Sequence, residues 1–110
     1  MGLIKSEIFT EEQNRLAALA KGLGHPARIA LVQHLLKVQT CICGDLVEEI
    51  GLAQPTISQH LKGLKQIGLL KGRVEGTSVC YCIDQQNWEQ ARVVFAQMFD
   101  QTAFCSDTCC

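Results

Sequence analysis

The sequence predicts a mainly α-helical domain that carries one small β-hairpin. Apolar residues recur at helical spacing in several separate segments, and one segment around Gly76 alternates with the period of paired strands. The chain has 110 residues, of which 47% are hydrophobic. A chain of this length forms one domain and removes roughly 65% of its unfolded surface from water. We therefore expect a single domain over residues 1–110, with a folded core at 10–104 and a cysteine-rich tail at 105–110.

Two helices are expected in the first third of the chain. Thr10-Glu11-Glu12-Gln13 has the residues of a capping box, and leucines follow it at helical spacing, so the first helix should span about Glu11–Leu23. Gly24-His25-Pro26 ends that helix and begins a second one, because proline is tolerated in a first turn. The second helix should end near Lys37, and its broad apolar face marks it as the central core helix. The residues of this face are Ile29, Leu31, Val32, Leu35 and Leu36.

The middle of the chain has the pattern of a helix-turn-helix. A short third helix should cover about Cys43–Ile50, and Gly51 fits the left-handed position after a helix end. Pro55 is tolerated only in a first turn, so a fourth helix should begin at about Gln54 and end before Gly68. Its apolar side consists of Ile57, Leu61 and Leu64. Two helices joined by such a short turn are typical of DNA-binding proteins whose second helix enters the major groove.

The polar residues of the fourth helix are of the types that contact DNA. Hydroxyl and amide side chains reach base edges, and glutamine suits adenine, whereas lysine contacts phosphates. The candidates to read bases are Gln54, Thr56, Ser58, Gln59 and His60, and the candidates to bind phosphate are Lys62 and Lys65. The alternative interpretation is a generic helical pair in an all-α domain.

The charge distribution and the following segment favour DNA binding. The chain carries a net charge of −1, but the stretch from Gln54 to Val74 has four basic residues and no acid, which leaves −5 on the rest. The segment from Leu69 to Ile83 alternates around Gly76 and predicts a β-hairpin, which forms a wing when it follows a helix-turn-helix. The wing residues expected to contact the DNA backbone or minor groove are Arg73 and Thr77.

A last helix is expected from a cap at Asp84 to about Thr102. Its apolar stripe consists of Trp88, Ala91, Phe95, Met98, Phe99 and Thr102. Little of the domain remains to cover a terminal aromatic stripe, so we expect it to form a homodimer interface together with the first helix. Burial on the monomer's own core is the alternative. Two-fold symmetry would place two reading helices one turn of double-stranded DNA apart, facing a palindromic operator.

Several separate blocks resemble one known family. They are Leu23–Ile29, Gln54–Lys62, Gly68–Leu70 and Glu75–Tyr81. Over roughly residues 10 to 100 the chain is similar to the ArsR/SmtB family of metal-responsive repressors. The resemblance implies a dimeric winged helix-turn-helix that binds its operator without metal and releases it when a metal or metalloid binds.

The chain has seven cysteines, and some of them are expected to bind the inducer. Family members that respond to arsenite often carry Cys-Val-Cys-Asp-Leu on the third helix, and others place a cysteine cluster beyond the last helix. The resemblance therefore implies two candidate sites. Our first choice is Cys105, Cys109 and Cys110, which can supply three thiolates from one short segment. Our second choice is Cys41 and Cys43, where the additional Gly44 departs from the family pattern.

The ligand chemistry narrows the inducer. Sulfur-only ligand sets select soft, thiophilic ions, so we expect arsenite or antimonite, As(III) or Sb(III), and no permanent cofactor. Cadmium, lead or bismuth sensing and a thiol redox response on the same fold are the alternatives. Cys80 and Cys82 share one face of a strand and are expected to be structural thiols. The histidines, for which we expect roles other than ligation, are His25, His34 and His60.

Catalysis and membrane insertion are not expected. No cysteine is followed by five residues and an arginine, as phosphatase-like reductases require, and no glycine-rich phosphate loop is present. No apolar run approaches the roughly 18 residues that span a membrane, and the first residues lack the pattern of a secretory signal. Dense cysteine without an export signal is typical of a reducing compartment, so we expect a cytoplasmic protein.

Overall fold

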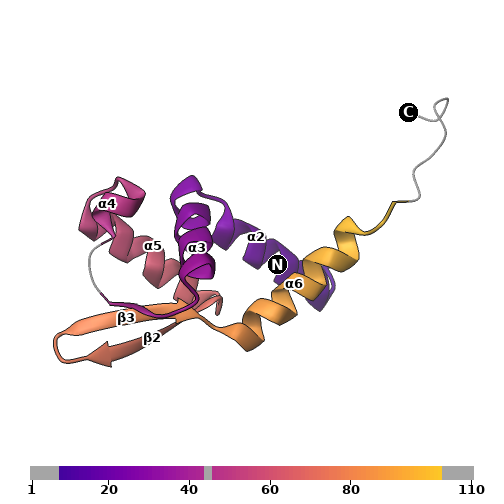
Figure 1. The fold of residues 1–110 in the computed structure, drawn as a ribbon. Coiled ribbons are helices and arrows are strands. Elements are labelled where there is room, and N and C mark those ends of the chain that lie inside the picture. Colours follow the sequence, from indigo (N-terminus) through magenta and orange to yellow (C-terminus); the bar gives the residue numbers. More distant parts are fainter. Residues whose placement is uncertain (1–7, 44–45, 103–110) are drawn as a thin grey trace, which may run out of the picture.

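The structure has the predicted mainly α-helical architecture with a β-hairpin. It is a computed structural model that describes residues 8–43 and 46–102, with the backbone alone for Cys43 and Glu48. Its elements are α2 (Glu11–Leu23), α3 (Pro26–Val38), β1 (Ile42–Cys43), α4 (Val47–Ile50), α5 (Gln54–Gln66), β2 (Leu70–Glu75), β3 (Ser78–Ile83) and α6 (Gln85–Phe99). The hairpin of β2 and β3 and the helix α6 extend in opposite directions from the body formed by α3, α4 and α5 (Figure 1).

Capping interactions explain where the first two helices begin. The Thr10 hydroxyl accepts a hydrogen bond from the Gln13 amide, and the Gln13 side chain accepts one from the Thr10 amide, each at 3.0 Å. At the start of α3, Nδ1 of His25 accepts a 3.0 Å hydrogen bond from the Ala27 amide. Both helices begin at the predicted residues. The buried stripe of α3 is narrower than predicted, because Ile29 and Leu36 are 41% and 37% exposed.

The prediction of a third helix from about Cys43 was wrong in its extent. The helix α4 has only the four residues Val47–Ile50, and Cys43 belongs to the strand β1. This strand pairs antiparallel with β3. The pairing satisfies the backbone hydrogen-bonding groups of β1, which would lose these bonds if the segment were helical. Leu46, which precedes α4, is 4% exposed and packs in the core.

The hairpin is part of a three-stranded antiparallel sheet in the order β1-β3-β2. Its turn lies at Gly76, as predicted, where the backbone takes a φ of 61°. The register places Ile42 opposite Tyr81, and Gly72 opposite the same tyrosine on the other side. The β1 strand therefore ties the segment before the helix-turn-helix to the wing.

The helix α6 begins after a cap at Asp84, whose carboxylate accepts a 3.1 Å hydrogen bond from the Asn87 amide. It ends at Phe99, three residues before the predicted end at Thr102. The C-cap residue Asp100 places a negative charge at the negative end of the helix dipole, which disfavours continuation of the helix. Among the described residues, no helix is long and apolar enough to cross a membrane.

Candidate nucleic-acid interface

The reading helix α5 is fixed to the core by three apolar side chains. Ile57, Leu61 and Leu64 are 0%, 4% and 0% exposed, and they belong to one buried cluster with Leu31 and Leu35 of α3. The preceding turn takes Gly51 to a φ of 84°, a conformation that glycine adopts without strain. The predicted start of α5 at Gln54 and its apolar side are confirmed.

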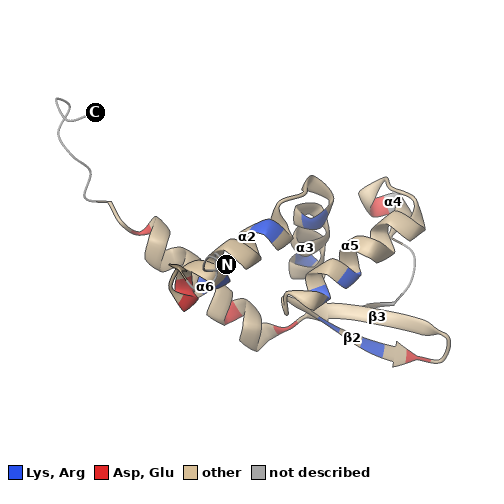
Figure 2. Cartoon of the chain, turned by 180° about the vertical axis from the view of Figure 1, so that it is seen from behind, with Lys and Arg blue, Asp and Glu red and all other residues tan. Residues whose placement is uncertain are grey.

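The opposite side of α5 presents polar residues to the outside. Thr56, Gln59, Lys62 and Lys65 are all exposed. The helices α3 and α5 carry lysine or arginine and no acidic residue, whereas α2 and α6 carry both kinds of charge and α4 carries only acidic residues (Figure 2). The helices α3 and α5 therefore form a basic surface on a chain of negative net charge, as the charge pattern predicted. A basic surface of this kind suits a polyanion such as DNA.

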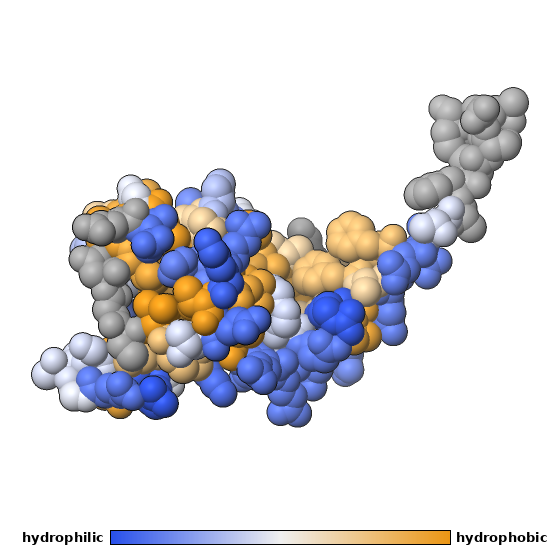
Figure 3. Space-filling model, in the orientation of Figure 1, coloured by the Kyte–Doolittle hydropathy of each residue, from blue (hydrophilic) through white to orange (hydrophobic). Residues whose placement is uncertain are grey.

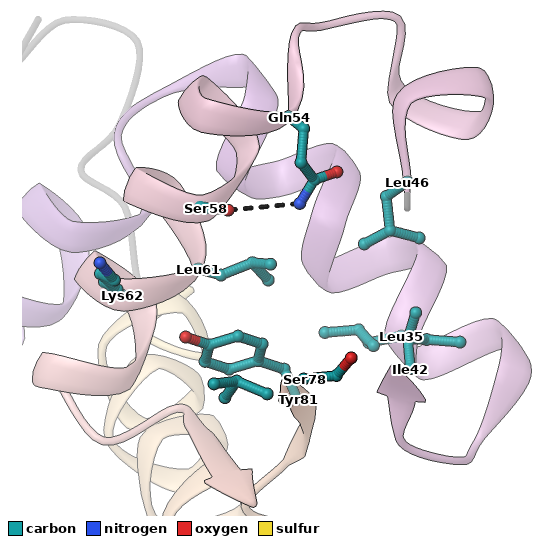
Figure 4. Close-up of a pocket in the computed structure, with 10 residues that line it drawn as sticks. Leu35, Ile42, Leu46, Gln54, Ser58, Leu61, Lys62, Ser78 and Tyr81 are labelled. Atoms are coloured by element: carbon teal, nitrogen blue, oxygen red, sulfur yellow. Dashed lines mark hydrogen bonds between the residues drawn. The ribbon is translucent and has the colours of Figure 1, made fainter. Parts of the chain in front are cut away.

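Two other base-reading candidates on α5, Gln54 and Ser58, are half-buried and not exposed. The Gln54 amide nitrogen donates a 3.2 Å hydrogen bond to the Ser58 hydroxyl, at the edge of a pocket of about 410 Å³ (Figure 4). Leu61 and Tyr81 line the same pocket between α5 and the wing. The buried Gln54 Oε1 has no hydrogen-bond partner among the residues that the structure describes. The role of Gln54 in base reading stays a prediction.

His60 is the base-reading candidate most engaged inside the protein. Its Nδ1 accepts a 3.1 Å hydrogen bond from Nε of Arg28, and its ring lies 4.4 Å from that of His25, centroid to centroid. Nη1 of Arg28 also donates to the Gly22 carbonyl at 2.9 Å. The role of His60 in base reading stays a prediction, and the structure adds a role in positioning α5.

Arg28 was not predicted as a contact of the reading helix. Its guanidinium lies against Gly63 of α5, where a Cβ atom would collide with it. One side chain thus joins α2, α3 and α5, through the Gly22 carbonyl and His60. The signal in the sequence was Gly63 inside a helix. Glycine destabilises a helix interior, so its presence there indicates that another group packs closely against the backbone.

Acid is expected to destabilise the protein through His60. Partial burial, followed by the nearby His25 and Arg28, lowers the pKa of His60 from its ordinary value near 6.5. A protonated ring cannot accept the Arg28 hydrogen bond. A lowered folded-state pKa contributes stability that is fully present above the unfolded-state pKa and is lost as pH falls through the folded-state pKa. The thermal midpoint should therefore fall between about pH 7 and about pH 5.

The matched variants for this experiment are His60→Asn and His34→Asn. Asparagine at position 60 offers an acceptor close to the place of Nδ1 but does not titrate, so the pH dependence should become shallower. The variant at His34, which is half-buried on α3, should keep the wild-type slope. An unchanged slope in His60→Asn would assign the pH dependence to other groups.

The wing carries the two predicted contacts at its exposed end. Arg73 forms an ion pair with Glu75 at 2.6 Å, and both side chains are more than half exposed. Thr77 lies in the exposed turn between β2 and β3. An exposed ion pair contributes little to stability, so a phosphate can replace Glu75 as the partner of Arg73 at small cost.

The two Cys-x-Cys segments are brought together across β1 and β3. Cys41 and Cys82 are free, half-buried thiols that share a hydrogen bond. Burial, together with Cys41, raises the pKa of Cys82, while Lys71 and Arg73 act in the opposite direction. Cys80 is 0% exposed and disulfide-bonded, and the backbone of Cys43 lies opposite it.

The first-choice inducer site, formed by Cys105, Cys109 and Cys110, lies outside the described residues. The second-choice pair, Cys41 and Cys43, lies at and before a strand and not on a helix. Among side chains that the structure describes, no group of three or more His, Cys, Asp or Glu residues is positioned to hold a metal ion.

The α6 stripe is buried at one end and exposed at the other. Ala91 is 4% exposed, and Trp88 and Phe95 pack against the core cluster. Met98 and Phe99 are 49% and 72% exposed, and the Phe99 ring stacks on Phe95 at 6.4 Å between centroids. Apolar side chains gather along the arm formed by α2 and α6 (Figure 3). The inner part of the stripe is therefore buried on the monomer's own core, and the outer part has no cover among the described residues. The homodimer interface stays a prediction.

Comparison with known proteins gives a consistent family. Residues 25–71 match the family described as "Bacterial regulatory protein, arsR family". An uncharacterised HTH-type transcriptional regulator from Methanocaldococcus jannaschii is 34% identical over 86 residues, which cover 76% of this chain and 96% of that protein. The HTH-type transcriptional repressor SmtB from Mycobacterium tuberculosis is 41% identical over 63 residues, or 57% of this chain and 46% of SmtB. This chain thus matches less than half the length of SmtB.

A further relative and a solved structure extend the match beyond the DNA-binding segment. The cadmium resistance regulatory protein CadC homolog from Staphylococcus aureus is 30% identical over 78% of this chain and 71% of its own length. The crystal structure of the transcriptional repressor BigR from Xylella fastidiosa has a TM-score of 0.62 at 30% identity, covering 92% of this chain and all of BigR's. These relatives are transcriptional regulators and not enzymes. The chain therefore belongs to the ArsR family, as a winged helix-turn-helix transcriptional repressor that binds DNA.

Proposed function

We propose that this repressor binds a palindromic operator as a homodimer and releases it when arsenite or antimonite binds cysteine thiolates. The observation that carries the DNA-binding half is the exposed polar face of α5 beside the wing, held by a buried apolar side. The thiol half is supported by seven cysteines in 110 residues and by the relative named for cadmium resistance. Sulfur ligands select soft ions, which include trivalent arsenic and cadmium.

Dimerisation is supported by the arm of α2 and α6. Its exposed apolar side chains include Met98 (49%) and Phe99 (72%) of α6, and Phe9 (50%) lies just before α2. Contiguous exposed apolar surface is typical of an interface, and a second copy of the same arm would cover it isologously. A two-fold dimer would then present two α5 helices to successive major grooves on one side of the DNA.

Release requires that inducer and operator favour different conformations of the dimer. To move the population from mostly bound to mostly free, the inducer must bind the released conformation more tightly by roughly 5 kcal/mol. The strand β1 gives such a ligand a short path, because it lies immediately before α4 and α5 and pairs with the wing. The tail cysteines would act through α6 and the dimer interface.

The experiment is an operator release assay by fluorescence anisotropy on a duplex selected from a random pool. Arsenite is titrated into complexes of wild type, Cys41→Ser/Cys43→Ser and Cys105→Ser/Cys109→Ser/Cys110→Ser. If arsenite does not release wild type, the metalloid proposal is wrong. A triple variant that alone remains bound identifies the tail as the sensor, and a double variant that alone remains bound identifies the β1 segment.

Two alternatives are tested in the same assay. Cadmium in place of arsenite tests the chemistry named by the CadC relative. Hydrogen peroxide without metalloid tests a thiol redox response, which the disulfide-bonded Cys80 favours as the second candidate. Release by peroxide and not by arsenite would replace the proposed inducer with an oxidant.

Two exposed residues of α5 are expected to contribute to DNA binding in different ways. Lys62→Ala should weaken all duplexes about equally and reduce the slope of log affinity against log salt by about 1, because one phosphate contact is lost. Gln59→Ala should leave this slope unchanged and should lose about 1–3 kcal/mol of discrimination at one base pair. Binding to a set of single-base operator variants at several salt concentrations distinguishes the two. Equal behaviour of the two variants would contradict the assignment.

A further inference from the structure

The sheet register sets one cysteine of each Cys-x-Cys segment against one of the other. Ile42 pairs with Tyr81 and Cys43 with Cys80, so the next position of the same antiparallel register places Cys41 opposite Cys82. Ile42 and Tyr81 line the pocket between the sheet and α5. Because successive residues of a strand point to opposite faces, Cys41 and Cys82 belong to the other face. Cys41 precedes β1, and Cys82 lies near the end of β3.

That other face is open to ligands. Cys41 and Cys82 both line a cleft of about 1050 Å³, together with Lys71, Arg73 and Trp88. Both thiols are free and half-buried, and they are hydrogen-bonded to each other. Cys82 was expected to be a structural thiol like Cys80, but of these two cysteines only Cys80 is fully buried.

Basic residues flank the thiol pair. On β2, which pairs with the other side of β3, Lys71 lies directly opposite Cys82, and Arg73 lies opposite Cys80. These cations offset part of the effect of burial, which raises the pKa of Cys82, and so favour the thiolate, the form that binds a metal or metalloid. The face therefore combines two adjacent soft ligands, nearby positive charge and access from solvent.

We propose that Cys41 and Cys82 form a cross-strand dithiol site for trivalent arsenic. Two thiols and one monosubstituted arsenic(III) oxide give a cyclic dithioarsenite. Two As–S bonds form, the As–O bond is broken, and the two thiol protons leave with the oxygen as water. No change of oxidation state is involved. This inference rests on the proposed function and names a residue, Cys82, that neither candidate inducer site included.

The site would connect the two parts of the protein that contact DNA. An arsenic atom bound to Cys41 and Cys82 links the segment before α4 and α5 to the last strand of the wing. The bound form would therefore fix the position of the wing relative to the reading helix. Such a link changes operator affinity if the DNA-bound conformation needs a different relative position.

The chain contains a reporter for this site. Trp88 is its one tryptophan and lines the same cleft as the two thiols. An arsenical bound between Cys41 and Cys82 should change the Trp88 emission. A ligand held only by the tail cysteines is not expected to do so through this cleft.

The experiment uses phenylarsine oxide and the reduced, full-length protein. The test variant, Cys43→Ala/Cys80→Ala/Cys105→Ser/Cys109→Ser/Cys110→Ser, keeps only Cys41 and Cys82, and its matched control adds Cys41→Ser. By native mass spectrometry the test variant should retain one phenylarsenic per chain in excess glutathione, whereas the control should lose it. Two-point attachment should raise the resistance to glutathione by about 100-fold or more. Equal loss from both variants overturns the proposal.

A second measurement covers the possibility that replacing the buried Cys80 unfolds the test variant. In the otherwise wild-type chain, Cys82→Ser should remove the response of Trp88 emission to phenylarsine oxide, and Cys109→Ser should keep it. An unchanged response in Cys82→Ser contradicts the site. Operator release by arsenite is scored separately, so a protein that binds at Cys41 and Cys82 without releasing DNA refutes the proposed function and leaves the dithiol site standing.

Discussion

Replacing Ile57 by alanine is expected to lower the free energy of unfolding by about 2–5 kcal/mol, because the variant leaves a cavity in a packed core. Ile57 is 0% exposed and lies in the same buried cluster as Leu31, Leu35 and Leu64. A small domain is typically stable by only about 5–15 kcal/mol, so this loss is a large fraction of the total. Urea denaturation monitored by circular dichroism measures it. Protein concentration must be held constant, because formation of the proposed dimer would add to the apparent stability.

Val74→Ala is the control for this experiment. It also shortens a β-branched apolar side chain, but Val74 is 73% exposed on the wing. Its effect should be within about 0.5 kcal/mol of zero. A loss at Val74 comparable to that at Ile57 would show that the wing is covered in solution, and a small loss at Ile57 would show that α5 is not anchored as described.

Phe99→Asp is expected to convert the protein to a monomer and to weaken operator binding by about 100-fold to 10,000-fold, because the two reading helices then lose their effective concentration for each other. Phe99 is 72% exposed at the end of α6, and it stacks on Phe95. A charge at this position would be buried unpaired in a two-fold interface. Sedimentation velocity measures the oligomeric state, and anisotropy on the selected operator measures affinity.

The matched control is Gln97→Asp, which introduces the same charge two residues earlier on the same helix. Gln97 is exposed and is not part of the apolar stripe. The control should remain a dimer and keep most of its operator affinity. Loss of binding in a Phe99→Asp protein that is still dimeric would place this residue in DNA contact or in conformational coupling, and not in the interface.

The helix-turn-helix could be predicted because its limits are set by local chemistry. Gly51 supplies a left-handed turn, and Pro55 can stand only in a first turn, so α5 had to begin near Gln54. The capping box at Thr10 and the cap at Asp84 fixed two further helix starts in the same way. Each of these signals lies within four residues of the feature that it specifies.

The parts that escaped prediction depend on contacts between distant residues. The strand β1 has two residues, and only its pairing with β3, nearly 40 residues later, makes it a strand. The Arg28–His60 hydrogen bond joins positions 32 residues apart. The adjacency of Cys41 and Cys82 follows from the same long-range register. Periodicity and spacing report local structure only. They therefore could not show that the two Cys-x-Cys segments lie side by side in the sheet.

The start of α5 shows a compromise between stability and activity. The residue at the N-cap position is Ala53, and it supplies no side-chain hydrogen bond to the first turn, unlike Thr10 in α2 and Asp84 in α6. A serine or aspartate there would stabilise the helix by about 1 kcal/mol. It would also occupy amide groups at the positive end of the helix dipole, which can otherwise bind a phosphate. An engineer who seeks a more heat-resistant repressor should therefore improve helix caps elsewhere, because the uncapped start of α5 belongs to the helix that we propose binds DNA.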